Sequence, residues 1–231
     1  MQKLILLRME KYNYLYILLY LSAFLDLRVE NLKISVNSHT TKLVLENKRC
    51  TGVLYEIKGK LFKADARREV IISAGTINSP QILEISGIGN PDVLNANGVE
   101  VNHLSPGVGE NLRDHYAPRT RWEIAAPGVT YNDKARGLGI AWQAMRYLAT
   151  KKGMMGIPAA PMRAFIKTRE GLDAPDGLLG WLPLLYDTNY KLSKTSGVIC
   201  YAHAMRPEST GHVHIVSSDP KQPPKIQYNF L

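Results

Sequence analysis

The stretch that decides the fold is Arg68-Glu69-Val70-Ile71-Ile72-Ser73-Ala74-Gly75-Thr76-Ile77-Asn78-Ser79-Pro80-Gln81-Ile82-Leu83-Glu84-Ile85-Ser86-Gly87-Ile88-Gly89. Its first part, Val70–Ile72, is a β-branched run typical of a buried strand. Gly75 follows, where the missing side chain allows a sharp turn of the backbone or the close approach of a ligand. The stretch therefore predicts a buried strand that turns directly into a helix.

The helical part carries signals for both of its ends. Ser79 is a favourable N-cap, and Pro80 suits the first helical position because its missing N–H costs nothing there. Gly87 is the expected C-cap. A strand that meets a helix across a small residue is a common binding place for a phosphate or sugar. An ordinary strand–helix unit without a ligand is the alternative interpretation of this local pattern.

The same residues resemble a family signature. Gly75-Thr76, Ser79-Pro80, Ile82-Leu83 and Ser86–Gly89 are similar, in order and without gaps, to the second signature of the glucose–methanol–choline (GMC) oxidoreductases. That family uses FAD to oxidise alcohols, and in its mechanism a base takes the hydroxyl proton while hydride passes to the flavin. The resemblance therefore implies FAD as cofactor and a small-molecule alcohol as substrate.

The resemblance runs from about residue 32 to residue 231 and implies contacts with the adenosine end of FAD. Thr40 stands where the family usually has valine, whose backbone contacts the adenine, so the change is tolerated. Ala74 and Gly75 resemble the residues that lie nearest to the adenosine.

A second segment resembles the part of the family near the flavin. Gly107-Val108-Gly109-Glu110-Asn111-Leu112-Arg113-Asp114-His115 is similar to a Gly-Val-Gly-x-Asn-Leu-x-Asp-His pattern. The resemblance implies that Asn111, Asp114 and His115 bind the cofactor. Gly153–Gly156 and Ala202–Ser209 look most like the choline-dehydrogenase branch of the family.

Two family motifs have no match in this sequence. The three Gly-x-Gly pairs, which begin at Gly87, Gly107 and Gly137, lack the third glycine of the dinucleotide-phosphate fingerprint. None of the six histidines fits the family's His-x-x-Gly-Thr-type motif, which carries the catalytic base, so no catalytic residue is assigned. The sequence looks like the central piece of a GMC enzyme, which we expect to be inactive alone. The alternative is a non-catalytic remnant or an interaction module.

We expect a mixed α+β and α/β fold in three parts. Residues 1–30 form an atypical apolar leader, residues 31–117 a partial FAD-binding domain and residues 118–231 part of an antiparallel-sheet substrate domain. The first domain combines the strand–helix unit with an antiparallel meander of strands at 32–36, 41–45, 52–57 and 61–66. Beyond the strand–helix unit we predict a helix at 91–97 and a strand at 99–101 in the same domain. In the second domain we predict a helix at 137–151 and strands at 163–167, 178–184, 198–205 and 212–217.

Composition and charge narrow the class of partner. The net charge of +9 is spread over scattered Lys and Arg residues without an aromatic-interleaved basic run, which argues against nucleic acid. The apolar run Tyr14–Leu25 is too short for a membrane span. Two distant cysteines predict free, buried thiols and a cytoplasmic protein, whose basic surface also suits the periphery of a membrane. Exposed sheet edges would favour a complementary chain or a homo-oligomer.

The histidines give no metal site. His212 and His214 alternate on a predicted strand, so both rings face one side, but no third ligand accompanies them and a surface pair is expected. Asp114 and His115 are candidates for an acid–base pair, although neighbours in sequence usually point apart.

Overall fold

The computed structural model describes residues 3–7, 32–126, 128–158 and 160–230, which divide into two compact units. The first unit contains the residues up to Leu112 together with Ser209–Asn229, and the second contains Arg113–Glu208 and Phe230. The predicted division near residue 118 placed everything after it in one domain. In the structure the C-terminal segment Ser209–Asn229 instead packs with the first unit.

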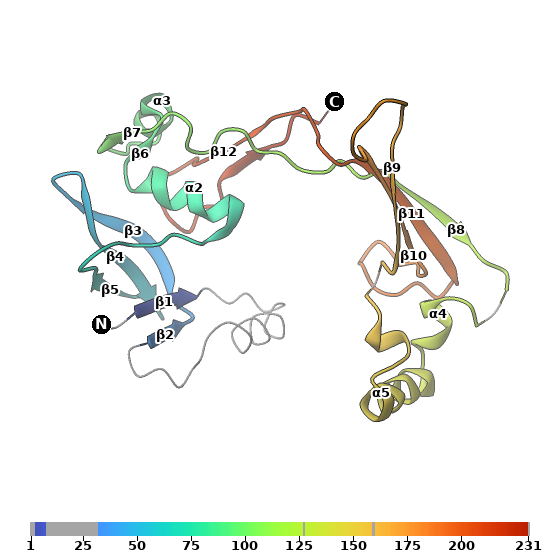
Figure 1. The fold of residues 1–231 in the computed structure, drawn as a ribbon. Coiled ribbons are helices and arrows are strands. Elements are labelled where there is room, and N and C mark those ends of the chain that lie inside the picture. Colours follow the sequence, from blue (N-terminus) through green and yellow to red (C-terminus); the bar gives the residue numbers. More distant parts are fainter. Residues whose placement is uncertain (1–2, 8–31, 127, 159, 231) are drawn as a thin grey trace. The chain divides into compact units, whose positions relative to one another are not determined.

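The first unit combines small sheets with two helices (Figure 1). Its elements, in chain order, are β1 (Lys3–Leu7), β2 (Leu32–Val36), β3 (His39–Glu46), β4 (Arg49–Ile57), β5 (Lys60–Asp65), α2 (Gly75–Ile85), β6 (Ile88–Gly89), α3 (Pro91–Ala96), β7 (His103–Leu104), β12 (His212–His214) and β13 (Lys225–Gln227). Strands β3, β4 and β5 form an antiparallel sheet, and the other strands pair two by two.

The antiparallel meander is confirmed for β3, β4 and β5. Leu43 pairs with Val53, and Val53 pairs with Ala64, which places an apolar row across the sheet. Both hairpin turns contain two residues of positive φ, Asn47-Lys48 and Lys58-Gly59. Such turns match the right-handed twist of the strands that they join.

Strand β2 does not join this meander, which corrects the prediction. It pairs in parallel with β1, for example through Ile5 and Ile34. Strand β1 falls within the residues expected to form an apolar leader, whereas the run Tyr14–Leu25 lies outside the described residues.

The predicted buried strand at Val70–Ile72 is wrong. Residues 69–73 pair with no strand among the described residues, and the side chain of Ile71 is 78% exposed. A strand needs a neighbour for its ladder of hydrogen bonds, and a β-branched run by itself cannot supply one.

Helix α2 begins earlier than predicted. Gly75 has a φ of +85° and is already in the helix, and the Oγ of Ser79 accepts a hydrogen bond of 3.1 Å from the backbone N–H of Ala74. Ser79 and Pro80 are therefore interior residues rather than N-cap and first position. At the other end the C-cap is Ser86, one residue before the predicted Gly87, which follows it with a φ of +80°.

The core of the first unit lies where α2, α3 and the C-terminal segment meet. Its buried members are Ile85, Leu94, Val99 and Ile215. Val99 belongs to this core as part of a loop, so the strand predicted at 99–101 is wrong. The strand there is β7, four residues later, which pairs in parallel with β6.

Helix α2 is joined to strand β12 through a buried carboxylate. Glu84 is completely buried, and its oxygens accept hydrogen bonds from Nδ1 of His214 at 2.7 Å and from the backbone N–H of Ile215 at 2.8 Å. Nε2 of His214 lies 2.9 Å from a carboxylate oxygen of Glu110. His212 and His214 do stack, with ring centroids 5.0 Å apart, but the side chain of His214 is only 15% exposed and links two carboxylates, so it is not the surface residue predicted.

The second unit is built on a four-stranded antiparallel sheet, ordered β8-β11-β10-β9. Figure 1 shows the two α-helices of this unit at one end of that sheet. Its elements are β8 (Arg119–Glu123), α4 (Tyr131–Lys134), α5 (Leu138–Thr150), the short 3₁₀ helix η1 (Met154–Gly156), β9 (Met162–Ile166), β10 (Gly177–Leu182) and β11 (Gly197–Ala204). The predicted helix at 137–151 and the three later strands of this unit are confirmed within two residues.

The apolar side of α5 faces solvent in the described part of the chain. The helix has the predicted stripe of Leu138, Trp142, Met145 and Leu148, but these side chains are 58–90% exposed. Strand β8, which was not predicted, is also exposed along its whole length. Amphipathic periodicity thus gave the helix correctly and the buried face wrongly.

We predict that Glu84→Gln lowers the free energy of unfolding by about 1–3 kcal/mol, because the buried amide would turn an N–H₂ group toward one of two donors. Glu110→Gln, at the half-exposed end of the same cluster, should cost at most about 1 kcal/mol. Urea unfolding monitored by circular dichroism gives both values. Equal losses would contradict a special role for the buried carboxylate.

Candidate functional site

The residues predicted to lie at the adenosine end of FAD belong to β3 and to the start of α2. Thr40 pairs with Tyr55 in the sheet and is half-buried, whereas Ala74 and Gly75 are exposed. Helix α2 packs against β3. The structure therefore places a half-buried strand residue and an exposed helix start on two elements that pack together.

The backbone turns at Gly75 as predicted, and the space beside this residue is open. A side chain at this position would be strained by the φ of +85°, yet a Cβ atom there would meet nothing within 4 Å. The backbone is thus accessible at this point, as the close approach of a ligand requires. The N–H of Ala74 is already occupied by the Oγ of Ser79.

Asn111 lies on a loop that is fixed to the C-terminal segment. Its side chain is exposed, and its φ is +59°. Leu112 and Gly211 exchange two backbone hydrogen bonds of 2.9 and 2.8 Å. A Cβ atom at Gly109 would come within 2.3 Å of the carbonyl oxygen of Val213, so this glycine is required for the close contact between the two segments.

The cluster of Glu84, His214 and Glu110 connects these parts of the first unit. Glu84 lies on α2, the helix that begins at Gly75, and Glu110 directly precedes Asn111. Each ring nitrogen of His214 faces one carboxylate, so the ring donates to both when it carries both protons. One imidazole therefore links helix α2 to the loop that carries Asn111.

Asp114 and His115 belong to the second unit and are exposed. Oδ1 of Asp114 accepts the backbone N–H of His115 at 2.8 Å, while Nε2 of His115 lies 3.1 Å from the carbonyl oxygen of Met205. The ring of His115 stacks on that of His203, with centroids 4.1 Å apart. The two side chains do not bond to each other, so they form no acid–base pair.

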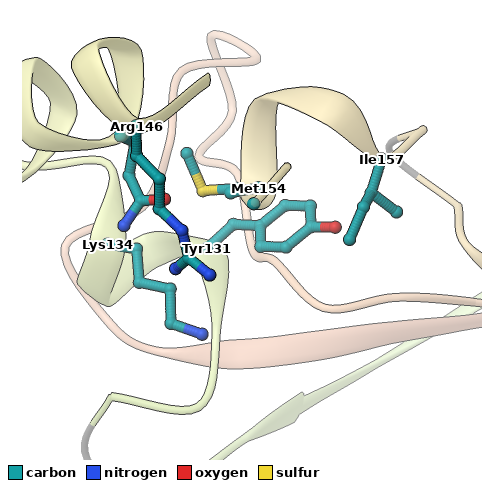
Figure 2. Close-up of a pocket in the computed structure, with 7 residues that line it drawn as sticks. Tyr131, Lys134, Arg146, Met154 and Ile157 are labelled. Carbon is teal, nitrogen blue, oxygen red and sulfur yellow. The ribbon is translucent and has the colours of Figure 1, made fainter. Parts of the chain in front are cut away.

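A pocket that the sequence did not reveal lies in the second unit, between α4, α5 and η1 (Figure 2). Its volume is about 190 Å³, and it is lined by Tyr131, Lys134, Gln143, Arg146, Gly153, Met154 and Ile157. Two of these residues are basic and none is acidic. No motif pointed to the pocket, because its residues come from three elements and follow no single spacing.

The position of α4 at this pocket is set by Asn132. This residue is fully buried, and its amide donates to the carbonyl oxygens of Leu185 and Ser193 at 2.7 and 2.9 Å. Its Oδ1 accepts the N–H of Leu185 at 2.8 Å. The backbone of Tyr131 is held as well, by a 2.8 Å bond to the carbonyl oxygen of Pro183.

Asp133 completes a capping box at the start of α4. Its carboxylate accepts hydrogen bonds from the hydroxyl of Ser196 and from the N–H and hydroxyl of Thr130. The bond from Ser196, and then that from the Thr130 backbone, lowers the pKa of Asp133 below its usual value, because both favour the charged form. This carboxylate is therefore engaged at the helix start.

Comparison with known sequences identifies relatives of the chain. Residues 21–117 match the family model of the GMC oxidoreductases. Oxygen-dependent choline dehydrogenases from Photobacterium profundum and Vibrio vulnificus are 34% and 36% identical to the chain over 203 residues. The chain is a relative of the GMC oxidoreductases. The alignments cover 87% of the chain and 35% and 36% of these two dehydrogenases, so it spans about a third of their length.

Solved structures of GMC flavoenzymes share the fold of this GMC relative. A crystal structure of formate oxidase superposes with a TM-score of 0.77 and 24% identity, covering 87% of this chain and 40% of that one. A variant of the formate oxidase from Aspergillus oryzae RIB40, studied for its FAD modification, gives the same values. Pyridoxine 4-oxidase from Mesorbium loti gives 0.65 at 19% identity, with 87% of this chain and 36% of that chain covered. The predicted resemblance to the FAD-dependent GMC family is confirmed.

The described residues of this GMC relative fit one part of a FAD site. Small, exposed residues at Ala74 and Gly75, with open space beside the glycine, suit the approach of an adenosine. The Gly-x-Gly-x-x-Gly turn that would hold the pyrophosphate is not in the sequence. The fit therefore concerns the adenosine end alone.

Other features of the described residues add no further site. No group of three or more potential metal ligands occurs in the described ranges. Within those same ranges, no helix has the length and apolar character that crossing a membrane would require. Cys50 and Cys200 are free, as predicted, and half-buried.

We predict that Gly75→Ala destabilises the first unit by about 1–2 kcal/mol, because alanine is strained at positive φ. Gly107→Ala is the matched control, since a Cβ there also meets nothing and its φ is not positive. Its effect should stay within about 0.5 kcal/mol. Urea unfolding of the three proteins tests the difference, and a neutral Gly75→Ala would refute the conformational requirement.

We predict that Ser196→Ala raises the pKa of Asp133 toward its usual value of 3.8, because the hydrogen bond with the largest effect is removed. A lowered pKa in the folded state stabilises the protein above the usual pKa, and this stabilisation is lost as the pH falls through the folded value. The carboxyl carbon of Asp133, followed by NMR from pH 6 to pH 2, reports the shift. Asp176, whose pKa is lowered by Thr168, should titrate unchanged.

Proposed function

We propose that this chain contributes part of the adenosine cradle and part of the substrate wall of a FAD-dependent oxidoreductase that acts on CH–OH groups. The observation that carries the proposal is the start of α2, where Ala74 and Gly75 are exposed and open space adjoins a helix N-terminus. Gly75 also opens the stretch that resembles the family signature. The names of the relatives, choline dehydrogenase and formate oxidase, support small-molecule donors.

Each proposed residue has a distinct task. Thr40 offers its backbone to the adenine, while Ala74 and Gly75 leave room for the adenosine beside the turn. Asn111, Asp114 and His115 would contact the cofactor toward its flavin end. FAD, when bound, supplies the acceptor for the hydride of the alcohol.

We further propose that the chain alone does not oxidise alcohols. The sequence contains no His-x-x-Gly-Thr-type motif for the base that would take the hydroxyl proton, and no fingerprint for the pyrophosphate. A positioned base contributes on the order of 10²- to 10⁴-fold to such reactions. We therefore expect weak FAD binding and no turnover.

The proposal predicts that Ala74→Leu weakens FAD binding at least about tenfold, because the larger side chain fills the exposed space at the turn, a loss of about 1.4 kcal/mol. Ala96→Leu is the matched control, an exposed alanine of the same unit on α3. Flavin fluorescence titration of the purified chain measures the affinity, with circular dichroism to verify folding.

Two outcomes of this titration would contradict the proposal. Equal affinity of both variants would remove the start of α2 from the FAD site, and detectable alcohol oxidation by the chain would refute the statement on turnover. A folded chain that binds no FAD would favour the second candidate, an interaction module. The observation that favours that candidate is the exposed apolar stripe of α5, from Leu138 to Leu148.

A further inference from the structure

We infer that the pocket between α4, α5 and η1 binds a small organic anion, a carboxylate with a short apolar body. The pocket lies entirely in the second unit and includes none of the residues proposed to hold FAD. Its binding can therefore be tested independently of the proposed function.

The charge of the pocket comes from two cations that have no acidic partner. Lys134 and Arg146 both line it, and no carboxylate of the described residues forms an ion pair with either of them. Figure 2 shows their charged ends pointing to the same side of Tyr131. Two like charges in one pocket repel each other, and an anion between them relieves that repulsion.

The surrounding sequence strengthens this positive field. Residues 131–157 contain the basic residues Lys134, Arg136, Arg146, Lys151 and Lys152 and one acidic residue, Asp133. The oxygens of Asp133 are occupied by the hydrogen bonds of the capping box and Ser196. The one acidic side chain of residues 131–157 therefore does not neutralise the basic residues of the pocket.

The amide of Gln143 is open to the pocket. Gln143 is only 9% exposed and lines the pocket, and its amide forms no hydrogen bond with another described residue. No buried side-chain nitrogen or oxygen of the described residues lacks a hydrogen-bond partner, so the amide atoms of Gln143 are accessible. The amide N–H₂ can therefore donate to a carboxylate in the pocket.

The apolar residues and the size of the pocket favour a small organic anion over an inorganic one. Met154, Ile157 and the ring of Tyr131 give an apolar surface beside the charged groups (Figure 2). A volume of about 190 Å³ is below the range of roughly 300–1,000 Å³ typical of drug-sized ligands. A short carboxylic acid satisfies both the charged and the apolar sides, whereas inorganic phosphate satisfies only one.

The same charges exclude a cationic ligand. Quaternary ammonium groups are bound by aromatic faces and carboxylates, and this pocket offers one tyrosine ring and two positive charges. Choline, the donor named in the relatives, is therefore not the ligand of this pocket.

The test is an NMR titration of the full chain at low salt, with the side-chain amide of Gln143 as the reporter. Butyrate is the probe, and butyramide, inorganic phosphate and choline are the comparisons. We expect butyrate to shift the Gln143 amide and to saturate it, and the neutral amide and choline to leave it unchanged. Butyrate should bind about fourfold more tightly than phosphate, because only butyrate contacts the apolar wall, and burying about one methylene there accounts for that ratio.

Variants separate the pocket from the general positive charge. Lys134→Ala and Arg146→Ala should each weaken butyrate about tenfold, the loss of one charge-assisted hydrogen bond. Gln143→Glu keeps the shape but adds a negative charge, and should abolish binding; because this variant lacks the reporter amide, the backbone amide of Gly153, which also lines the pocket, reports on it. Lys194→Ala removes a cation of the same unit that does not line the pocket and should have no effect.

Several results would overturn the inference. They are an unshifted Gln143 amide, equal affinity for butyrate and phosphate, and equal weakening by Lys134→Ala and Lys194→Ala. Folded Gln143→Glu protein that still binds butyrate would do the same, and native circular dichroism spectra establish that each variant is folded.

Discussion

The buried carboxylate of Glu84 joins two segments that are 130 residues apart in the chain, helix α2 and strand β12. A buried charge is costly unless hydrogen bonds compensate it, and here His214 and the backbone N–H of Ile215 do so. The apolar core around Leu94 forms next to this contact. Because His214 also reaches Glu110, one cluster fixes both the helix that starts at the exposed turn and the loop that carries Asn111. The proposed cofactor-facing parts of the first unit depend on it.

In the second unit, the fully buried amide of Asn132 holds helix α4 in place. Its three hydrogen bonds satisfy backbone groups of residues 185–193 and hold the one-turn helix α4 in place. A helix this short is not stable by itself, so the positions of Tyr131 and Lys134 at the pocket depend on Asn132 together with the capping box and the bond from Tyr131 to Pro183. In each unit a buried polar group thus orients a helix, and the residues proposed to face a ligand lie on or next to that helix.

Short motifs in the sequence were enough to find the relation to the family. The same motifs gave the proposed site residues Thr40, Ala74, Gly75, Asn111, Asp114 and His115, and the glycines near them have local structural causes. Gly75 and Gly87 have positive φ, and Gly109 lies against the backbone of Val213. Such requirements concern single residues and can therefore be predicted from the sequence. The contact between Glu84 and His214 could not be predicted, because two ordinary polar residues far apart in the sequence form no recognisable pattern. The anion pocket was missed for the same reason.

The sequence by itself determined the hairpins of β3–β5, helix α5 and the glycine after α2. It also determined the relation to the GMC oxidoreductases. These depend on periodicity, turn residues and motifs, all of which are local. Only the tertiary structure decided which apolar residues are buried. Val70–Ile72 and the stripe of α5 have the composition of buried surfaces, yet both are exposed or half-exposed in the described chain. The physical reason is that burial and strand pairing are properties of two surfaces in contact, and one surface cannot specify its partner.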